Sequence, residues 1–215
     1  MRRAIAGLYA VTPDVAGVLE LVAMAEAALT GGARLLQYRN KSATSELRIA
    51  QARALLALCR SMKVPLVIND HLELALTVGA DGVHLGAEDG SLATARERLG
   101  PARILGASCY DQLELALEAQ RLGADYVAFG SFFPSGVKPG AVRAPLTLLR
   151  DAKRRLSVPV VAIGGISLEN ARQLIATGAD SVAVISALFG ADDITDAARR
   201  FSKLFTQHEL AARHG

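Results

Sequence analysis

The sequence predicts an α/β protein with the (β/α)8 barrel (TIM barrel) fold, formed by one domain over residues 1–215. Three observations favour this class. Strand-like runs of Val, Ile, Leu and small residues alternate with stretches of helical period along the whole chain. A short Gly-Ala-Asp segment recurs between them. Hydrophobic residues make up 51% of the chain and aromatic residues only 5%, which suits the aliphatic filling of a parallel sheet.

Eight runs have the length and composition of buried parallel strands. They are expected at Gly7–Val11, Leu35–Arg39, Leu66–Ile68, Gly82–Leu85, Ile104–Ser108, Tyr126–Phe129, Val160–Ile163 and Ser181–Ile185. Apolar residues at helical spacing predict a helix after the second run, with a stripe formed by Leu47, Ala50, Ala54, Leu55 and Leu58. Asp111 followed by Glu114 signals the start of another helix.

A degenerate repeat supports this count of strands. Gly32-Ala33, Gly79-Ala80-Asp81, Gly123-Ala124-Asp125 and Gly178-Ala179-Asp180 each follow a helical pattern and precede a strand. Glycine suits the left-handed position that ends a helix, so the chain can turn directly into the next strand. One unit repeated eight times indicates a closed barrel, with an open doubly wound sheet as the alternative.

Totals for the chain exclude several classes of function. A net charge of +3 is too small to predict a nucleic-acid surface. Two cysteines without a CxxC spacing predict neither a disulfide framework nor a zinc site. No secretory signal or membrane-length apolar run is present in the sequence, so we expect a cytoplasmic protein with small-molecule substrates, no membrane or nucleic-acid partner, and possible homo-oligomers.

Polar residues gather where the predicted strands end, which is the catalytic face of such a barrel. Gln37, Arg39 and Lys41 alternate along the second strand and are expected to point to one side, as an anion site. Asp70 and Asp89 follow neighbouring strands, and paired carboxylates suit Mg²⁺ shared with substrate phosphates. The alternatives are a solvated strand end for the cations, a helix cap for Asp70 and surface charge for Asp89.

Two later segments also suit phosphate binding. Gly164-Gly165 precedes a predicted helix, and Ser186 ends the eighth strand, as in barrels that bind phosphate after strands seven and eight. Residues 130–144 are longer than an ordinary connection and are expected to form a lid in which Lys138 contacts phosphate. His84 lies near the mouth, where a hydrogen-bonded structural role is favoured over a direct chemical one.

Together these segments resemble the thiamine-phosphate synthase (thiamine-phosphate pyrophosphorylase) family. The resemblance covers nearly the whole chain, and its most specific pieces are Gln37-Tyr38-Arg39-Asn40-Lys41, Ile68-Asn69-Asp70, His84-Leu85-Gly86-Ala87-Glu88-Asp89 and Ala162-Ile163-Gly164-Gly165-Ile166. It implies that 4-amino-2-methyl-5-pyrimidinylmethyl diphosphate and a hydroxyethylthiazole phosphate, carboxylated or not, yield thiamine phosphate and diphosphate with Mg²⁺ as cofactor.

The resemblance also implies roles for individual residues. Those matching the pyrimidine-diphosphate site are Gln37, Arg39, Lys41, Asn69, Ser108 and Lys138, of which Arg39, Lys41, Ser108 and Lys138 are expected to act in catalysis. Asp70 and Asp89 match the Mg²⁺ ligands, and Gly165, Ile185 and Ser186 match the thiazole-phosphate site. Ser135 and Val137 stand where the family has a threonine-rich lid, and Ala87 stands where glutamine is common.

Two other functions remain open at this stage. A thiazole tautomerase of the same superfamily is disfavoured because no histidine occurs between His84 and His208, where the strand-six loop would need its acid or base. A non-catalytic phosphate-binding barrel is disfavoured by the presence of both Asp70 and Asp89 alongside the cations of the second strand.

Overall fold

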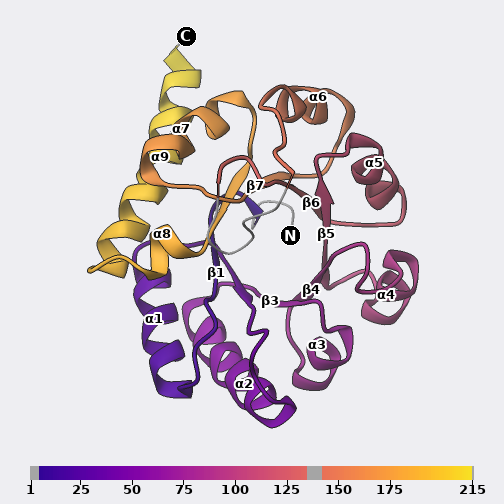
Figure 1. Cartoon of the computed structure of the whole chain (residues 1–215), viewed down its shortest axis with the longest axis vertical. Coiled ribbons are helices and arrows are strands. Elements are labelled where there is room, and N and C mark those ends of the chain that lie inside the picture. Colours follow the sequence, from indigo (N-terminus) through magenta and orange to yellow (C-terminus); the bar gives the residue numbers. More distant parts are fainter. Residues whose placement is uncertain (1–4, 135–141, 215) are drawn as a thin grey trace.

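The computed structural model describes residues 5–134 and 142–214, which form a closed (β/α)8 barrel. Eight parallel strands run in sequence order, and β1 pairs with β8 to close the sheet. Viewed down the barrel, the strands form an inner ring and the helices an outer one (Figure 1). The predicted fold class is therefore confirmed, and the open-sheet alternative is excluded.

The strands are short and lie close to their predicted bounds. They are β1 (Gly7–Val11), β2 (Leu35–Tyr38), β3 (Leu66–Asn69), β4 (Gly82–Leu85), β5 (Ile104–Tyr110), β6 (Tyr126–Phe129), β7 (Val160–Ile163) and β8 (Ser181–Val184). The helices are α1 (Val18–Thr30), α2 (Ser45–Met62), α3 (Leu72–Val78), α4 (Leu92–Leu99), α5 (Leu113–Arg121), α6 (Thr147–Arg155), α7 (Leu168–Thr177), α8 (Ser186–Phe189) and α9 (Ile194–His214).

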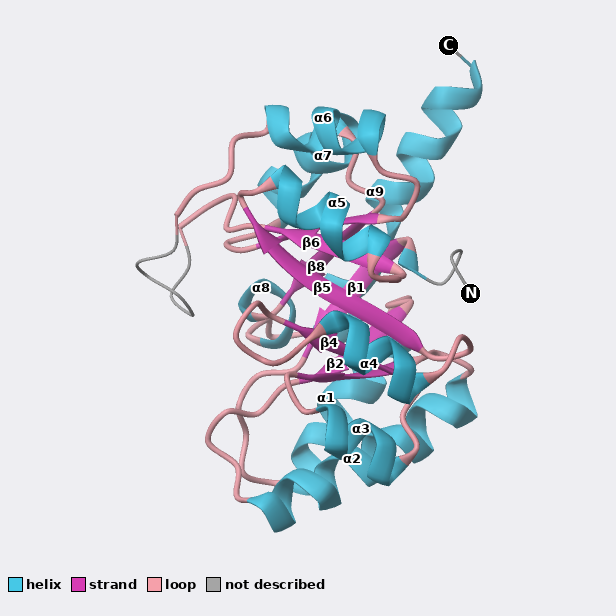
Figure 2. Ribbon diagram, turned by 90° about the vertical axis from the view of Figure 1, so that its right-hand side faces the viewer, coloured by secondary structure: helices cyan, strands magenta, loops and turns pink. Residues whose placement is uncertain are grey.

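The last helix packs on the outside of the barrel. α9 contacts α1 and α7, and it extends beyond the end of the other helices (Figure 2). Within the described ranges, no helix combines the length and hydropathy needed to cross a membrane.

Apolar side chains fill two separate layers. The larger layer lies between the strands and the helices, where Leu, Ala and Val predominate. The smaller one lies inside the barrel and includes Tyr9, Val67, Tyr126, Val161 and Ala183. Because successive residues of a strand point to opposite faces, every strand except β4 supplies apolar side chains to both layers.

The Gly-Ala-Asp repeat has a structural explanation. Its glycines at 32, 79, 123 and 178 all have positive φ, as the prediction required. Its aspartates accept a hydrogen bond from a backbone N–H near the start of the preceding strand: Asp81 from Leu66 at 2.8 Å, Asp125 from Leu105 at 2.9 Å and Asp180 from Val160 at 2.8 Å. Each carboxylate therefore joins two neighbouring strands at the amino-terminal end of the barrel.

Several predicted boundaries need correction. β2 ends at Tyr38 and β8 at Val184, so Arg39 and Ile185 lie just beyond their strands. The Thr12 hydroxyl accepts from the Arg39 N–H at 2.8 Å and donates to the Arg39 carbonyl at 2.9 Å, and these bonds replace the strand ladder. α5 begins at Leu113 after Gln112, so Asp111 does not occupy the cap position expected of it.

Replacing Asp125 with alanine should lower the free energy of unfolding by about 1–3 kcal/mol, because the buried Leu105 N–H loses its acceptor. The same change removes the ion pair between Asp125 and Arg96. Asp151→Ala is the matched control, since it removes only an exposed ion pair with Arg154. Urea denaturation measures both variants, and equal stabilities would contradict the role given to the repeat.

Candidate active site

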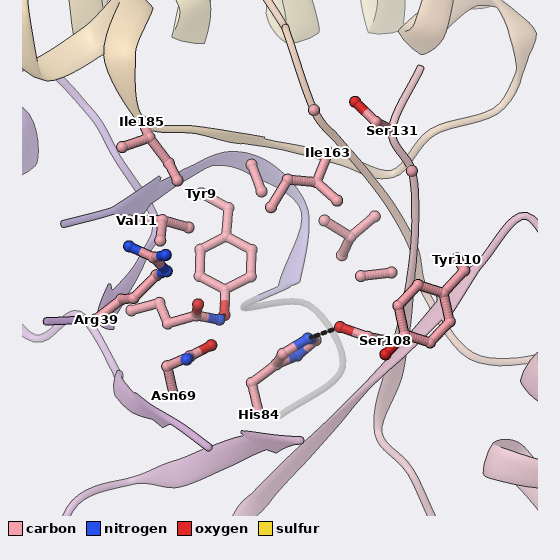
Figure 3. Close-up of a pocket in the computed structure, with 16 residues that line it drawn as sticks. Tyr9, Val11, Arg39, Asn69, His84, Ser108, Tyr110, Ser131, Ile163 and Ile185 are labelled. Carbon is pink, nitrogen blue, oxygen red and sulfur yellow. Dashed lines mark hydrogen bonds between the residues drawn. The ribbon is translucent and has the colours of Figure 1, made fainter. Parts of the chain in front are cut away.

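A cavity opens at the carboxyl ends of the strands and receives residues from the whole ring. Its lining consists of Tyr9, Val11, Gln37, Arg39, Asn69, His84, Ser108, Tyr110, Ala128, Gly130, Ser131, Val161, Ile163, Gly164, Ala183 and Ile185. In Figure 3, Tyr9, Arg39, Asn69 and His84 point toward its centre. We call it the inner cavity. Apart from Arg39, its polar groups are uncharged amides, hydroxyls and an imidazole.

A continuous chain of hydrogen bonds joins four residues of the inner-cavity lining through the buried Tyr126. The Gln37 amide donates to the Tyr9 hydroxyl at 2.6 Å, and the hydroxyls of Tyr9 and Tyr126 are 2.7 Å apart. His84 Nδ1 lies 2.9 Å from the Tyr126 hydroxyl. Its Nε2 lies 2.9 Å from Ser108 Oγ, the contact drawn as a dashed line in Figure 3. Burial raises the pKa of both tyrosines, so both remain protonated hydroxyls. The expected hydrogen-bonded state of His84 is confirmed.

A second, charged cavity adjoins the first and shares Arg39 and Asn69 with it. We call it the outer cavity, and its other lining residues are Tyr38, Asn40, Lys41, Arg48, Asp70, His71 and Asp89. Gln37 is directed inward while the exposed Lys41 lies in the loop beyond β2. The expectation that Gln37, Arg39 and Lys41 share one side of a strand is therefore wrong for Lys41, and of these three residues Arg39 is the one that lines both cavities.

Asp70 and Asp89 face each other in the outer cavity. Burial raises the pKa of Asp70 to about 6, and a hydrogen bond and charge repulsion from Asp89 add to the effect, while Lys41 opposes it. The Gly86 N–H donates to Asp89 at 2.8 Å and so fixes one of its oxygens. Two adjacent carboxylates with this destabilised charge fit a divalent cation, although no group of three metal-ligating side chains occurs among the described residues.

Two further charged residues of this region escaped prediction. Asp14 forms an ion pair with Arg39, with 3.0 Å between Oδ1 and Nη1. Because Arg39 is only 15% exposed, this contact fixes the direction of its guanidinium group. Arg48 of α2 lines the outer cavity, and its buried Nε has no hydrogen-bond partner within the described part of the chain.

The glycines after β7 lie beside the inner cavity, as expected of a phosphate-binding turn. Gly164 lines the cavity, and Gly165 follows with a φ of +63°. A side chain at Gly165 would meet the carbonyl oxygens of Phe133 and Pro134, so only glycine allows this close approach. Ile185 also lines the cavity, whereas Ser186 is exposed at the start of α8 and adjoins it.

The structure thus gathers most of the residues that the sequence predicted. Gln37, Arg39, Asn69, Ser108 and Ile185 line the inner cavity, while Lys41, Asp70 and Asp89 line the outer one. Ser135, Val137 and Lys138 lie outside the described residues.

Other lining or supporting residues went unpredicted: Tyr9, Asp14, Arg48, Tyr110 and Tyr126. For the two buried tyrosines a signal was available, because each stands at an inward position of a predicted strand and carries a hydroxyl that needs a partner.

Fold and cavity together define a (β/α)8-barrel enzyme whose site lies at the carboxyl ends of the strands. The sequence model of one family, described as thiamine monophosphate synthase, matches residues 8–188. The chain belongs to this family.

Individual relatives agree with that assignment. The thiamine-phosphate synthase of Nitrosomonas eutropha is 54% identical over 94% of this chain and 95% of its own length. That of Nitrosospira multiformis is 56% identical over 97% of this chain and 89% of its own. Among solved structures, thiamine phosphate pyrophosphorylase from Pyrococcus furiosus is similar with a TM-score of 0.83 and 37% identity, over 96% of this chain and 98% of that one.

Gly165→Ala should destabilise the protein more than backbone strain alone would. Gly79 provides the matched control, because its φ of +73° is nearly the same and the nearest atom to an added Cβ is the flexible end of Arg60, at 3.8 Å. We expect a loss of about 1–2 kcal/mol for Gly79→Ala from the left-handed backbone and a further loss of about 1–3 kcal/mol for Gly165→Ala from crowding. Thermal and denaturant unfolding test this, and equal losses would show that the Phe133 and Pro134 carbonyls impose no constraint.

Proposed function

We propose that the protein is a thiamine-phosphate synthase. It would join 4-amino-2-methyl-5-pyrimidinylmethyl diphosphate to a hydroxyethylthiazole phosphate and release diphosphate. With the carboxylated form of the thiazole, the carboxyl group would also leave, as CO2. One observation carries the proposal: an uncharged cavity and a charged cavity meet at Arg39 and Asn69. A substrate in which a polar aromatic ring is joined to a diphosphate likewise has one uncharged part and one charged part.

The inner cavity suits the ring portions of both substrates. Tyr9, Val11, Val161 and Ile163 offer apolar and aromatic surface, and Gln37 and Ser108 offer directed hydrogen bonds. Such a mixture of apolar walls with a few fixed polar groups is typical of small-molecule sites. The thiazole phosphate would lie toward Gly164, Gly165, Ile185 and Ser186, where backbone N–H groups precede α7.

The outer cavity suits the diphosphate. Arg39 and Lys41 bring positive charge to it, and each cation–phosphate contact at about 4 Å contributes on the order of 4 kcal/mol at a surface-like dielectric, before desolvation. Asp70 and Asp89 would hold Mg²⁺ there, which when bound neutralises the charge that develops on departing diphosphate. Lys138, whose residue type matches the family, would add a further cation from the segment outside the described residues.

The residues can support a dissociative substitution without a protein nucleophile. The bond between the pyrimidinylmethyl carbon and the diphosphate oxygen breaks, and its electron pair leaves with diphosphate. The ring amino group stabilises the resulting cation, and the thiazole nitrogen then supplies the electron pair of the new C–N bond. The protein's part is to position the two substrates and to place charge around the leaving group.

The activity itself is the first test. Purified protein with both substrates and Mg²⁺ at neutral pH should form thiamine phosphate and diphosphate in equal amounts, as measured by chromatography. Omission of the thiazole phosphate should suppress product formation. If both substrates bind and no product forms, the proposal is wrong, and tautomerisation of a thiazole substrate or phosphate binding without turnover would be the function to examine.

Asp70→Asn and Asp89→Asn should each lower kcat by about tenfold or more, as expected when a cation shared with phosphate loses a ligand. The free energy of unfolding should change little, because both residues lie at the loop face and not in the core. Glu88→Gln is the matched control, since it removes an exposed charge from the same loop. Titration of turnover against Mg²⁺ gives the result, and unchanged Mg²⁺ dependence in both Asn variants would remove them from the site.

A further inference from the structure

Tyr9 and His84 line the inner cavity, and the buried Tyr126 joins them by hydrogen bonds. Nothing in the proposed reaction requires these three side chains to react. Both tyrosines are fully buried, and His84 is only 6% exposed. Their rings are held in place: Tyr9 meets Tyr126 edge to face at 5.9 Å, and His84 stacks on Tyr126 at 5.4 Å. Polar side chains such as these three are costly to bury in a barrel core unless each is satisfied, which indicates a role beyond packing.

Gly106 shows how closely this group is fitted. A Cβ at this position would overlap the Tyr126 ring and hydroxyl and crowd Nδ1 of His84. β5 therefore leaves out a side chain where the tyrosine and histidine of the neighbouring strands meet. The space for Tyr126 and His84 is therefore formed by β4, β5 and β6 together.

The hydrogen bonds can be followed as a sequence of donors. Each hydroxyl has one hydrogen, so Tyr9, which accepts from Gln37, can donate its own to Tyr126. Tyr126 then donates to His84 Nδ1, which places the proton of a neutral imidazole on Nε2. Nε2 donates to Ser108 Oγ, and the Ser108 hydrogen is left to point into the inner cavity. The orientation of the Gln37 amide thereby determines whether Ser108 acts as a donor.

We propose that Tyr9, Tyr126 and His84 are positioning residues that couple Gln37 to Ser108, so that a ligand group donating to the Gln37 carbonyl oxygen makes Ser108 a donor toward an anionic oxygen. The inference rests on the proposed function, whose pyrimidine diphosphate carries an amino donor and a phosphate acceptor. If every hydrogen bond of the chain ran in the opposite direction, Ser108 would donate to His84 and present only lone pairs to phosphate. The chain of bonds therefore selects substrates that combine both groups.

A double-mutant cycle tests the coupling. Tyr126→Phe should lower kcat/KM for the pyrimidine diphosphate about tenfold, as for loss of a directed bond to a charged group, and leave the KM for the thiazole phosphate unchanged. In a Ser108→Ala background the same change should cost less than about twofold, because the group it acts through is gone. Ser181→Ala is the matched control, since it deletes a buried hydroxyl bond to the Gly7 carbonyl at the other end of the barrel. An equal loss in both backgrounds, or none in either, overturns the proposal.

Nitrogen NMR gives a second readout that does not depend on turnover. In ¹⁵N-histidine-labelled wild-type protein, with the signal assigned by its absence in His84→Gln, His84 should carry its proton on Nε2 and accept at Nδ1. Tyr126→Phe should change this pattern, and Ser181→Ala should not. A proton on Nδ1 in the wild-type complex with the pyrimidine diphosphate overturns the inferred polarity. Absence of product from the wild-type enzyme would instead count against the proposed function, and the NMR result would still decide the polarity.

Discussion

Closure of the sheet between β1 and β8 is the constraint on which the rest of the structure depends. Gly7, Leu8, Tyr9 and Ala10 pair with residues 181–184 across a chain separation of most of the protein. Once the last strand meets the first, no edge remains, and all eight carboxyl ends surround one opening. Side chains from β1, β2, β4, β5 and β6 that are distant in sequence then become neighbours inside the ring. The hydrogen-bond chain from Gln37 to Ser108 exists only because of this closure.

Desolvation explains why the site divides into an uncharged part and a charged part. Charged groups deep in a barrel would lose their hydration without adequate compensation, whereas hydroxyls and amides can satisfy one another. Inside the ring, Tyr9, Gln37, Tyr126 and His84 form the continuous chain with Ser108. Lys41 and Asp89 are exposed in the loops beyond. Arg39 lies between the two environments and keeps Asp14 as a counter-charge.

Local patterns predicted the strands, the positive-φ glycines and part of the lining of the two cavities, whereas Tyr9, Tyr110 and Arg48 went unpredicted. These predictions succeeded because the alternation of strand-like and helical runs, the helix-ending glycines and the polar strand ends are all visible in short segments of sequence. The contact between Tyr9 and Tyr126 spans 117 positions, and it depends on barrel register, which no short segment specifies. The end of β2 was misjudged for a related reason, since the Thr12 hydroxyl that interrupts the ladder at Arg39 belongs to another strand end. Asp14 and Arg48 were overlooked because helix-flanking charges are common on any surface.

Strained backbone occurs beside the two cavities, whereas the aspartates that join neighbouring strands lie at the other end of the barrel. Among the described residues with side chains, positive φ values occur at Lys63, Asp70 and Tyr110. Lys63 only ends a helix, but Asp70 and Tyr110 follow or end strands and line the two cavities. A left-handed backbone at such residues costs about 1–2 kcal/mol each, so the surrounding structure must impose it. At the other end, Asp81, Asp125 and Asp180 join strands in pairs through charge-assisted bonds. Asp70 thus keeps a left-handed backbone, and its carboxyl group interacts with that of Asp89 although the two charges repel each other.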